Sequence, residues 1–126
     1  MSYGYGMTMT LTQLVSAYAA LGNGGLLMKP MLVQEILNSS GEVIQKMETE
    51  SIERVISPAT SRQMVEMMKT VVEDGTAKRA AVPGYSVAGK TGTAKKAAVG
   101  GYSDTDRIGS FIGLIPADDP VLAIGI

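Results

Sequence analysis

The sequence predicts an α+β fold in which an antiparallel sheet packs against helices. Two segments, residues 10–21 and 57–73, carry apolar side chains at helical spacing, and three strand-like runs follow each other near the C-terminal end. Consecutive strands joined by short links are typical of an antiparallel meander. The chain has 126 residues, of which 45% are hydrophobic and 18% charged, which suits one globular domain or a piece of one.

The first helix is predicted to begin after Thr10. Threonine is a frequent N-cap, and Gln13, three residues later, completes a capping box. The "GNGG" run at residues 22–25 should end the helix. Its apolar side chains are expected to form a stripe that faces the core: Leu11, Leu14, Val15, Tyr18 and Leu21.

A hairpin and a second helix are expected next. Residues 31–47, "MLVQEILNSSGEVIQKM", predict two short strands around the turn "NSSG". Ser57 followed by Pro58 is an N-cap with proline at the first helical position, and "EDG" ends that helix. A methionine-rich face could form an adaptable groove, but a core face is the more frequent explanation. The face consists of Met64, Val65, Met68, Val71 and Val72.

Three strands are predicted in the C-terminal part, at residues 85–94, 107–115 and 121–126. The turn "PADDP" links the last two, with proline at both ends. The sequence stops at Ile126 inside an apolar run, and for this reason we interpret it as a fragment. We expect a strand edge without its natural cover to make the isolated chain self-associate.

The composition excludes several kinds of site. Without histidine or cysteine there is no Ser-His-Asp or Cys-His arrangement and no usual zinc site, so any general base must be lysine, a carboxylate or water. We expect neither a metal nor a cofactor. The net charge of −1 does not suggest a nucleic-acid surface. No stretch approaches the roughly 20 apolar residues of a membrane span.

Residues 84–93, "GYSVAGKTGT", fit two mechanisms. Gly84, Gly89, Lys90 and Thr91 match the phosphate loop G-x-x-x-x-G-K-[ST], which requires a preceding buried strand and a helix that starts at the Lys-Thr pair. The preceding "TAKRAAVP" is not strand-like, and Gly92 occupies what would be the first helical turn. The context therefore favours the alternative, a K-T-G motif on a strand.

A K-T-G strand suits an extended peptide that ends in a carboxylate. The strand edge can pair with the peptide, and Gly92 lets the two backbones approach closely. Lys90, Thr91 and Thr93 offer a cation and hydroxyl donors to a carboxylate. Strict alternation places Lys90 on the face opposite the two threonines, so one site can use all three only by straddling the edge or through a distortion at Gly92. Alone, K-T-G is also typical of an ordinary edge strand with a solvated lysine.

The longer context is more specific. "VEDGTAKRAAVPGYSVAGKTGTAKK", followed by "GGYSDTDRIGSFIGLIPADDP", resembles the transpeptidase domain of class B penicillin-binding proteins, particularly the cell-division type. The opening "SYGYGMTMTLTQLVSAYAALGNGG" resembles an earlier helix of that domain. The resemblance covers essentially all of residues 1–126 in family order, and implies part of the transpeptidase or serine β-lactamase-like fold.

The resemblance implies a membrane-anchored, extracytoplasmic serine D,D-transpeptidase that cross-links peptidoglycan stem peptides ending in D-Ala-D-Ala and is acylated by β-lactams. By motif, Lys90 would support the proton network and the substrate carboxylate, and Thr91 and Thr93 would donate hydroxyl groups to that carboxylate. The Thr93 backbone N–H would be an oxyanion donor, and Gly92 the clearance residue.

The sequence departs from the family in one respect. No serine has lysine three positions later, and none has asparagine two positions later, so Ser-x-x-Lys and Ser-x-Asn are both missing. "SDT" at residues 103–105 is the nearest imitation, on the wrong side of K-T-G. We therefore expect the C-terminal portion of a transpeptidase domain, inactive alone, whose partner is the rest of that domain. A non-enzymatic penicillin-recognising sensor remains an alternative.

Overall fold

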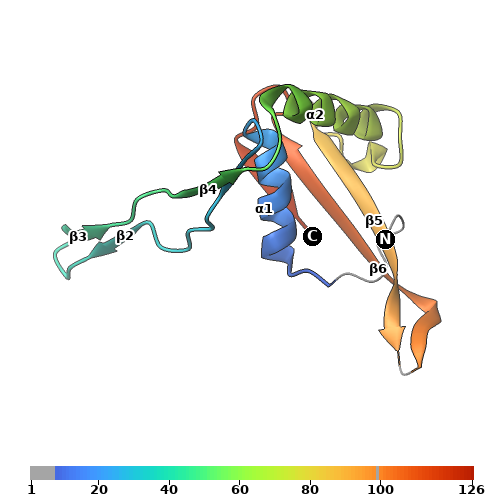
Figure 1. The fold of residues 1–126 in the computed structure, drawn as a ribbon, viewed down its shortest axis with the longest axis horizontal. Coiled ribbons are helices and arrows are strands. Elements are labelled where there is room, and N and C mark those ends of the chain that lie inside the picture. Colours follow the sequence, from blue (N-terminus) through green and yellow to red (C-terminus); the bar gives the residue numbers. More distant parts are fainter. Residues whose placement is uncertain (1–7, 99) are drawn as a thin grey trace.

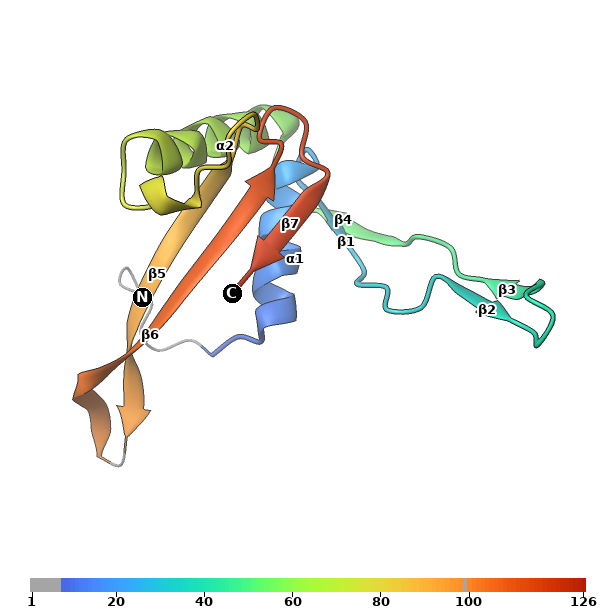
Figure 2. The same ribbon diagram turned by 180° about the vertical axis from the view of Figure 1, so that it is seen from behind.

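The computed structural model describes residues 8–98 and 100–126 and confirms an α+β fold. Helix α1 (Leu11–Gly22) lies across one face of a three-stranded antiparallel sheet, and α2 (Pro58–Glu73) crosses the end of the sheet (Figures 1 and 2). A short 3-10 helix, η1 (Lys78–Ala80), follows α2. Neither helix of the described residues has the length and apolar character needed to span a membrane.

Both helices begin at the caps that the sequence predicts. The backbone N–H of Gln13 donates to the Thr10 hydroxyl at 3.2 Å, and the Thr10 N–H donates to the Gln13 side chain at 2.9 Å, which completes the capping box. The Ser57 hydroxyl accepts from the N–H of Thr60 at 3.1 Å, with Pro58 in the first turn. These bonds satisfy N–H groups that have no partner inside the helix.

The apolar faces of the helices are only partly as predicted. The buried residues of α2 include Val65, Met68 and Val72, which confirms its core face. In α1, Tyr18 and Leu21 pack against the core, whereas Leu11 is 50% exposed. Leu11 still faces the sheet, with its Cδ1 beside Gly125 of β7, so the predicted stripe is oriented toward the core but is only half covered at its first residue.

The central sheet has the strand order β5-β6-β7, which confirms the meander. Strands β5 (Ala88–Ala98), β6 (Gly101–Ile115) and β7 (Leu122–Gly125) are all antiparallel. β5 starts at Ala88 rather than at residue 85, and both strands extend further toward each other than predicted, because their pairing continues as far as Ala98 and Gly101. Gly100 and Gly101 have positive φ there, a conformation that glycine adopts without a steric penalty.

Two core clusters hold the sheet to α2. The first joins Val65 and Met68 of α2 to Ala88, Leu114 and Ala117, and the second joins Val72 to Ala77 and Val87. Ala88 and Leu114 are almost fully buried, with 0% and 1% exposure. The start of β5 is thus the best-packed part of the chain, and it lies immediately before the K-T-G residues.

A β-hairpin arm projects from this body (Figure 1). Its tip pairs β2 (Glu35–Leu37) with β3 (Val43–Lys46), which confirms the predicted hairpin. Its base pairs β1 (Leu26–Met28) with β4 (Ser51–Arg54), and the sequence analysis missed both of these strands. With 3 and 4 residues they are too short to show an alternating pattern, and their pairing partners are distant in the sequence.

Candidate functional site

The K-T-G residues lie within β5, at the outer edge of the sheet. In the described part of the chain, β5 pairs with β6 on one side and has no ladder partner on the other. We call this second side the open edge. Lys90 pairs with Ile112, Thr91 with Phe111 and Thr93 with Gly109. Lys90 and Thr91 are thus in mid-strand, and no helix starts at them, so the phosphate-loop interpretation is wrong.

The pairing of β6 with β7 determines which β5 groups face the open edge. Phe111 exchanges both backbone hydrogen bonds with Ile126, each at 3.0 Å. A residue in an antiparallel strand directs its N–H and C=O to one side, so those of Phe111 point away from β5. Thr91 faces Phe111 in a non-hydrogen-bonded pair and therefore directs its own N–H and C=O to the open edge. Thr93, two residues on in an unbroken register, does the same.

Lys90 reaches the open edge although its side chain starts on the other face from the threonines. Its Nζ donates to the carbonyl oxygen of Thr91 at 2.7 Å, and the side chain is exposed. The candidate site therefore straddles the strand edge at Lys90 and Thr91, which is one of the two arrangements that alternation allowed. No distortion at Gly92 is needed, because the register of β5 is continuous from Ala88 to Lys95.

Thr91 has a partner that the sequence analysis missed. Its Oγ1 lies 2.9 Å from Oγ1 of Thr76, in the turn after α2, and either hydroxyl can donate. The two hydroxyl groups form a pair beside the open edge. The string "EDGTA" shows a helix end followed by threonine, but nothing local indicates that this turn returns to the K-T-G strand.

Two glycines of β5 have side chains of β6 packed where their own Cβ atoms would lie. A Cβ at Gly92 would lie 2.5 Å from Oγ of Ser110, so no side chain fits there unless the serine moves. A Cβ at Gly89 would overlap the ring of Phe111, which packs against the second core cluster. Gly89 thus lets the Phe111 ring lie directly against the strand, and Gly92 lets the Ser110 hydroxyl do the same.

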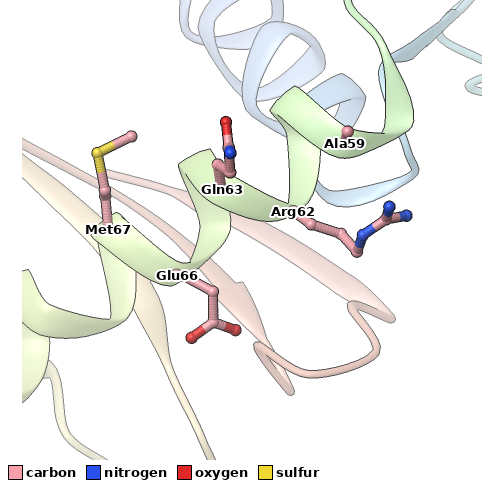
Figure 3. A pocket seen from close by; sticks show the side chains of 5 residues that line it. All are labelled: Ala59, Arg62, Gln63, Glu66 and Met67. Carbon is pink, nitrogen blue, oxygen red and sulfur yellow. The ribbon is translucent and has the colours of Figure 1, made fainter.

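The site is an exposed edge. A hollow of about 570 Å³ lies elsewhere, on the outer face of α2, and its lining includes none of the K-T-G residues. Figure 3 shows that all five of its side chains come from α2: Ala59, Arg62, Gln63, Glu66 and Met67. One helix cannot enclose a ligand, so the shape of this hollow is weaker evidence for a site than the chemistry of β5.

Ser103, of the "SDT" string, has a structural role. Its hydroxyl accepts from the backbone N–H of Asp106 at 3.0 Å and of Thr105 at 3.3 Å. These local bonds shape the outer part of the β5–β6 hairpin. The arrangement around β5 therefore offers an ammonium, hydroxyl groups and a free backbone edge, but the chain's own sequence supplies no serine nucleophile motif.

Comparisons with known proteins agree on a family. Residues 1–126 match the family model of the penicillin binding protein transpeptidase domain. Stage V sporulation protein D of Bacillus subtilis is 40% identical over 124 residues, covering 98% of this chain and 19% of that protein. A probable peptidoglycan D,D-transpeptidase, PbpC of Pseudomonas aeruginosa, is 38% identical over 127 residues, covering 100% of this chain and 20% of that protein.

A solved structure shows the same fold. Penicillin binding protein 3 from Mycobacterium tuberculosis, complexed with ampicillin, matches with a TM-score of 0.87 and 34% identity. The match covers 97% of this chain and 29% of that one. The chain thus spans about a fifth of the length of the relatives above.

Proposed function

Because the chain belongs to the penicillin binding protein transpeptidase domain family, we propose that it forms one wall of the active site of a serine D,D-transpeptidase. The reaction is acyl transfer: a serine attacks the penultimate D-alanine carbonyl of a peptidoglycan stem peptide, terminal D-alanine leaves, and an amine of a neighbouring stem takes the acyl group. β-Lactams would acylate the same serine. The observation that carries the proposal is the open edge of β5, with Lys90 reaching over it.

Each K-T-G residue has a role in this proposal. The extended stem peptide pairs with the open edge, and its terminal carboxylate is bound by the Lys90 ammonium and the hydroxyl groups of Thr91 and Thr93. The Thr93 N–H, on the same edge, donates to the oxyanion of the tetrahedral intermediate. One such donor is worth about 10²–10³ in rate. Gly92 provides clearance for the substrate backbone.

The nucleophile and its lysine come from a part of the protein other than this sequence. Residues 1–126 contain neither Ser-x-x-Lys nor Ser-x-Asn, and the chain covers 19% of the B. subtilis relative. We therefore assign residues 1–126 to the C-terminal portion of the transpeptidase domain, with the rest of that domain as its partner. A transpeptidase of this kind works on the outer side of the cytoplasmic membrane, held by an anchor outside this chain.

A fluorescent penicillin tests the function directly. The complete protein that contains this chain should become covalently labelled, whereas the isolated chain should not, because it lacks the serine. Unlabelled complete protein would refute the function, and stable labelling of the isolated chain would refute the missing nucleophile. Release of D-alanine from a synthetic stem peptide then separates a transpeptidase from a penicillin-recognising sensor, which would be acylated without turnover.

The isolated chain is also expected to self-associate. Large apolar side chains on and beside β7 are exposed, among them Val121 at 76% and Ile124 at 50%. Apolar surface next to a strand edge favours pairing between copies. Light scattering should show a mass that rises with concentration. A stable monomer at high concentration would contradict this, and the Ile124→Lys variant should shift the equilibrium toward monomer.

A further inference from the structure

Three polar side chains from separate segments meet at the start of β5. Nζ of Lys69, on α2, lies 2.7 Å from Oδ1 of Asp118, in the turn between β6 and β7. The hydroxyl of Ser86, which precedes β5, donates to the other oxygen, Oδ2 of Asp118, at 2.6 Å. Both oxygens of one carboxylate are thus bound, by groups from two different parts of the fold.

Hydrogen bonds from the backbone of Ala117 also hold Ser86 in place. The N–H of Ala117 lies 2.9 Å from the carbonyl oxygen of Ser86 and 3.1 Å from its hydroxyl oxygen, and it donates toward both. Ala117 is 2% exposed and Ala88 is 0% exposed, so the chain on each side of the polar group is buried in the first core cluster. Ser86 is therefore held by side-chain and backbone contacts at once.

The location matters because Ser86 leads directly into the K-T-G strand. At about 3.3 Å per residue, Lys90 lies only about 13 Å along the chain from Ser86. In addition to the apolar packing of α2 on β5, two polar contacts link these segments: Lys69 of α2 reaches the start of the strand through Asp118, and Thr76, in the turn after α2, pairs with Thr91. A displacement at the first place would move Lys90 and Thr93 relative to the rest of the active site.

We propose that Asp118 is a positioning residue for acyl transfer: its carboxylate, bound by Lys69 and Ser86, holds the start of β5 so that Lys90 and the Thr93 N–H keep their places. This inference rests on the proposed function. Its main rival is an ordinary surface ion pair, since the Asp118 side chain is 65% exposed. Exposed ion pairs contribute little to stability, so the two explanations differ in whether the rate falls more than the stability.

The protonation state of Asp118 makes this contact dependent on pH. The hydrogen bonds from Lys69 and then Ser86, together with the Lys69 charge, lower the pKa of Asp118. The same contact raises the pKa of Lys69, to which Glu66 and Glu73 of α2 also contribute. Since the folded carboxyl has the depressed pKa, the contact is complete above the ordinary carboxyl range, and it is lost as the pH falls through that lower value.

The test uses the complete protein and the second-order rate constant for acylation by fluorescent penicillin. Asp118→Ala should lower this rate about tenfold or more, because misplacing reacting groups by about 1 Å costs on the order of a hundredfold. Its thermal midpoint should fall by no more than about 2–4 °C. Ser86→Ala should give a smaller loss, and Ser86→Thr, which keeps the hydroxyl, should restore the rate. Asp119→Ala, with the same charge change in the same turn, is the matched control and should leave the rate unchanged.

These rates distinguish a positioning role of Asp118 from a purely structural one. A wild-type rate in Asp118→Ala, or an equal loss in Asp119→Ala, overturns the positioning role while the labelled wild type still supports the function. A loss that only follows the unfolded fraction makes Asp118 merely structural. If Asp118→Ala does not fold, the pair Ser86→Ala and Ser86→Thr decides: equal rates in the two overturn the inference. Absence of labelling in the wild type refutes the proposed function, and the inference with it.

Discussion

Replacing Lys90 with alanine is expected to lower the rate of acylation by penicillin by about 10²–10⁴ in the complete protein, the usual worth of a positioned proton-transfer group. Lys90 is the K-T-G cation, and its Nζ lies over the open edge at 2.7 Å from the Thr91 carbonyl oxygen. Under the proposed function, the alanine variant would lose both the charge that binds the carboxylate and the group that takes part in proton transfer. The second-order rate constant for labelling by a fluorescent penicillin measures the combined loss.

Lys90→Arg separates the two roles. Arginine keeps the cation but does not give up its proton near neutral pH. We expect it to bind a stem-peptide carboxylate more tightly than Lys90→Ala does, yet to be acylated slowly. Lys46→Ala is the control, because Lys46 is an exposed lysine of β3 in the hairpin arm. If folded Lys90→Ala were labelled as fast as the wild type, β5 would not be a wall of the active site.

Replacing Leu114 with alanine should reduce the free energy of unfolding by about 2–5 kcal/mol, the range for a leucine truncated in a packed core. Leu114 is 1% exposed and belongs to the cluster that joins α2 to the start of β5. It faces Ala88 across the sheet, so a cavity there would also loosen the strand that carries Lys90. Urea denaturation followed by circular dichroism, at low protein concentration, measures the change.

The hairpin arm offers a matched control for this measurement. Leu32 is 95% exposed, so Leu32→Ala removes the same atoms from a side chain that already lies in water. Its effect on unfolding should stay within about 0.5 kcal/mol. Equal effects of the two substitutions would mean that the packing around Leu114 does not stabilise the fold.

The candidate site could be predicted in part. The K-T-G residues are adjacent in the sequence, so their place on one strand follows from a local pattern: Lys90, Thr91, Gly92 and Thr93. The residues that argue against a phosphate loop are also next to this motif. Thr76 could not be found in this way. It reaches Thr91 only because α2 and η1 bring the chain back beside β5, a path that depends on the packing of Val72 and Ala77.

The amino-acid sequence by itself determined the features that depend on near neighbours. The Thr10 capping box, the Ser57–Pro58 helix start and the tip of the hairpin rest on contacts within a few residues, and the order of the three sheet strands follows from the short links between them. Tertiary structure alone decided which backbone groups of β5 face the open edge, since that depends on the pairing of Phe111 with Ile126. It also decided the meeting of Lys69, Ser86 and Asp118, because burial of distant apolar side chains brings these segments together and no local pattern records such contacts.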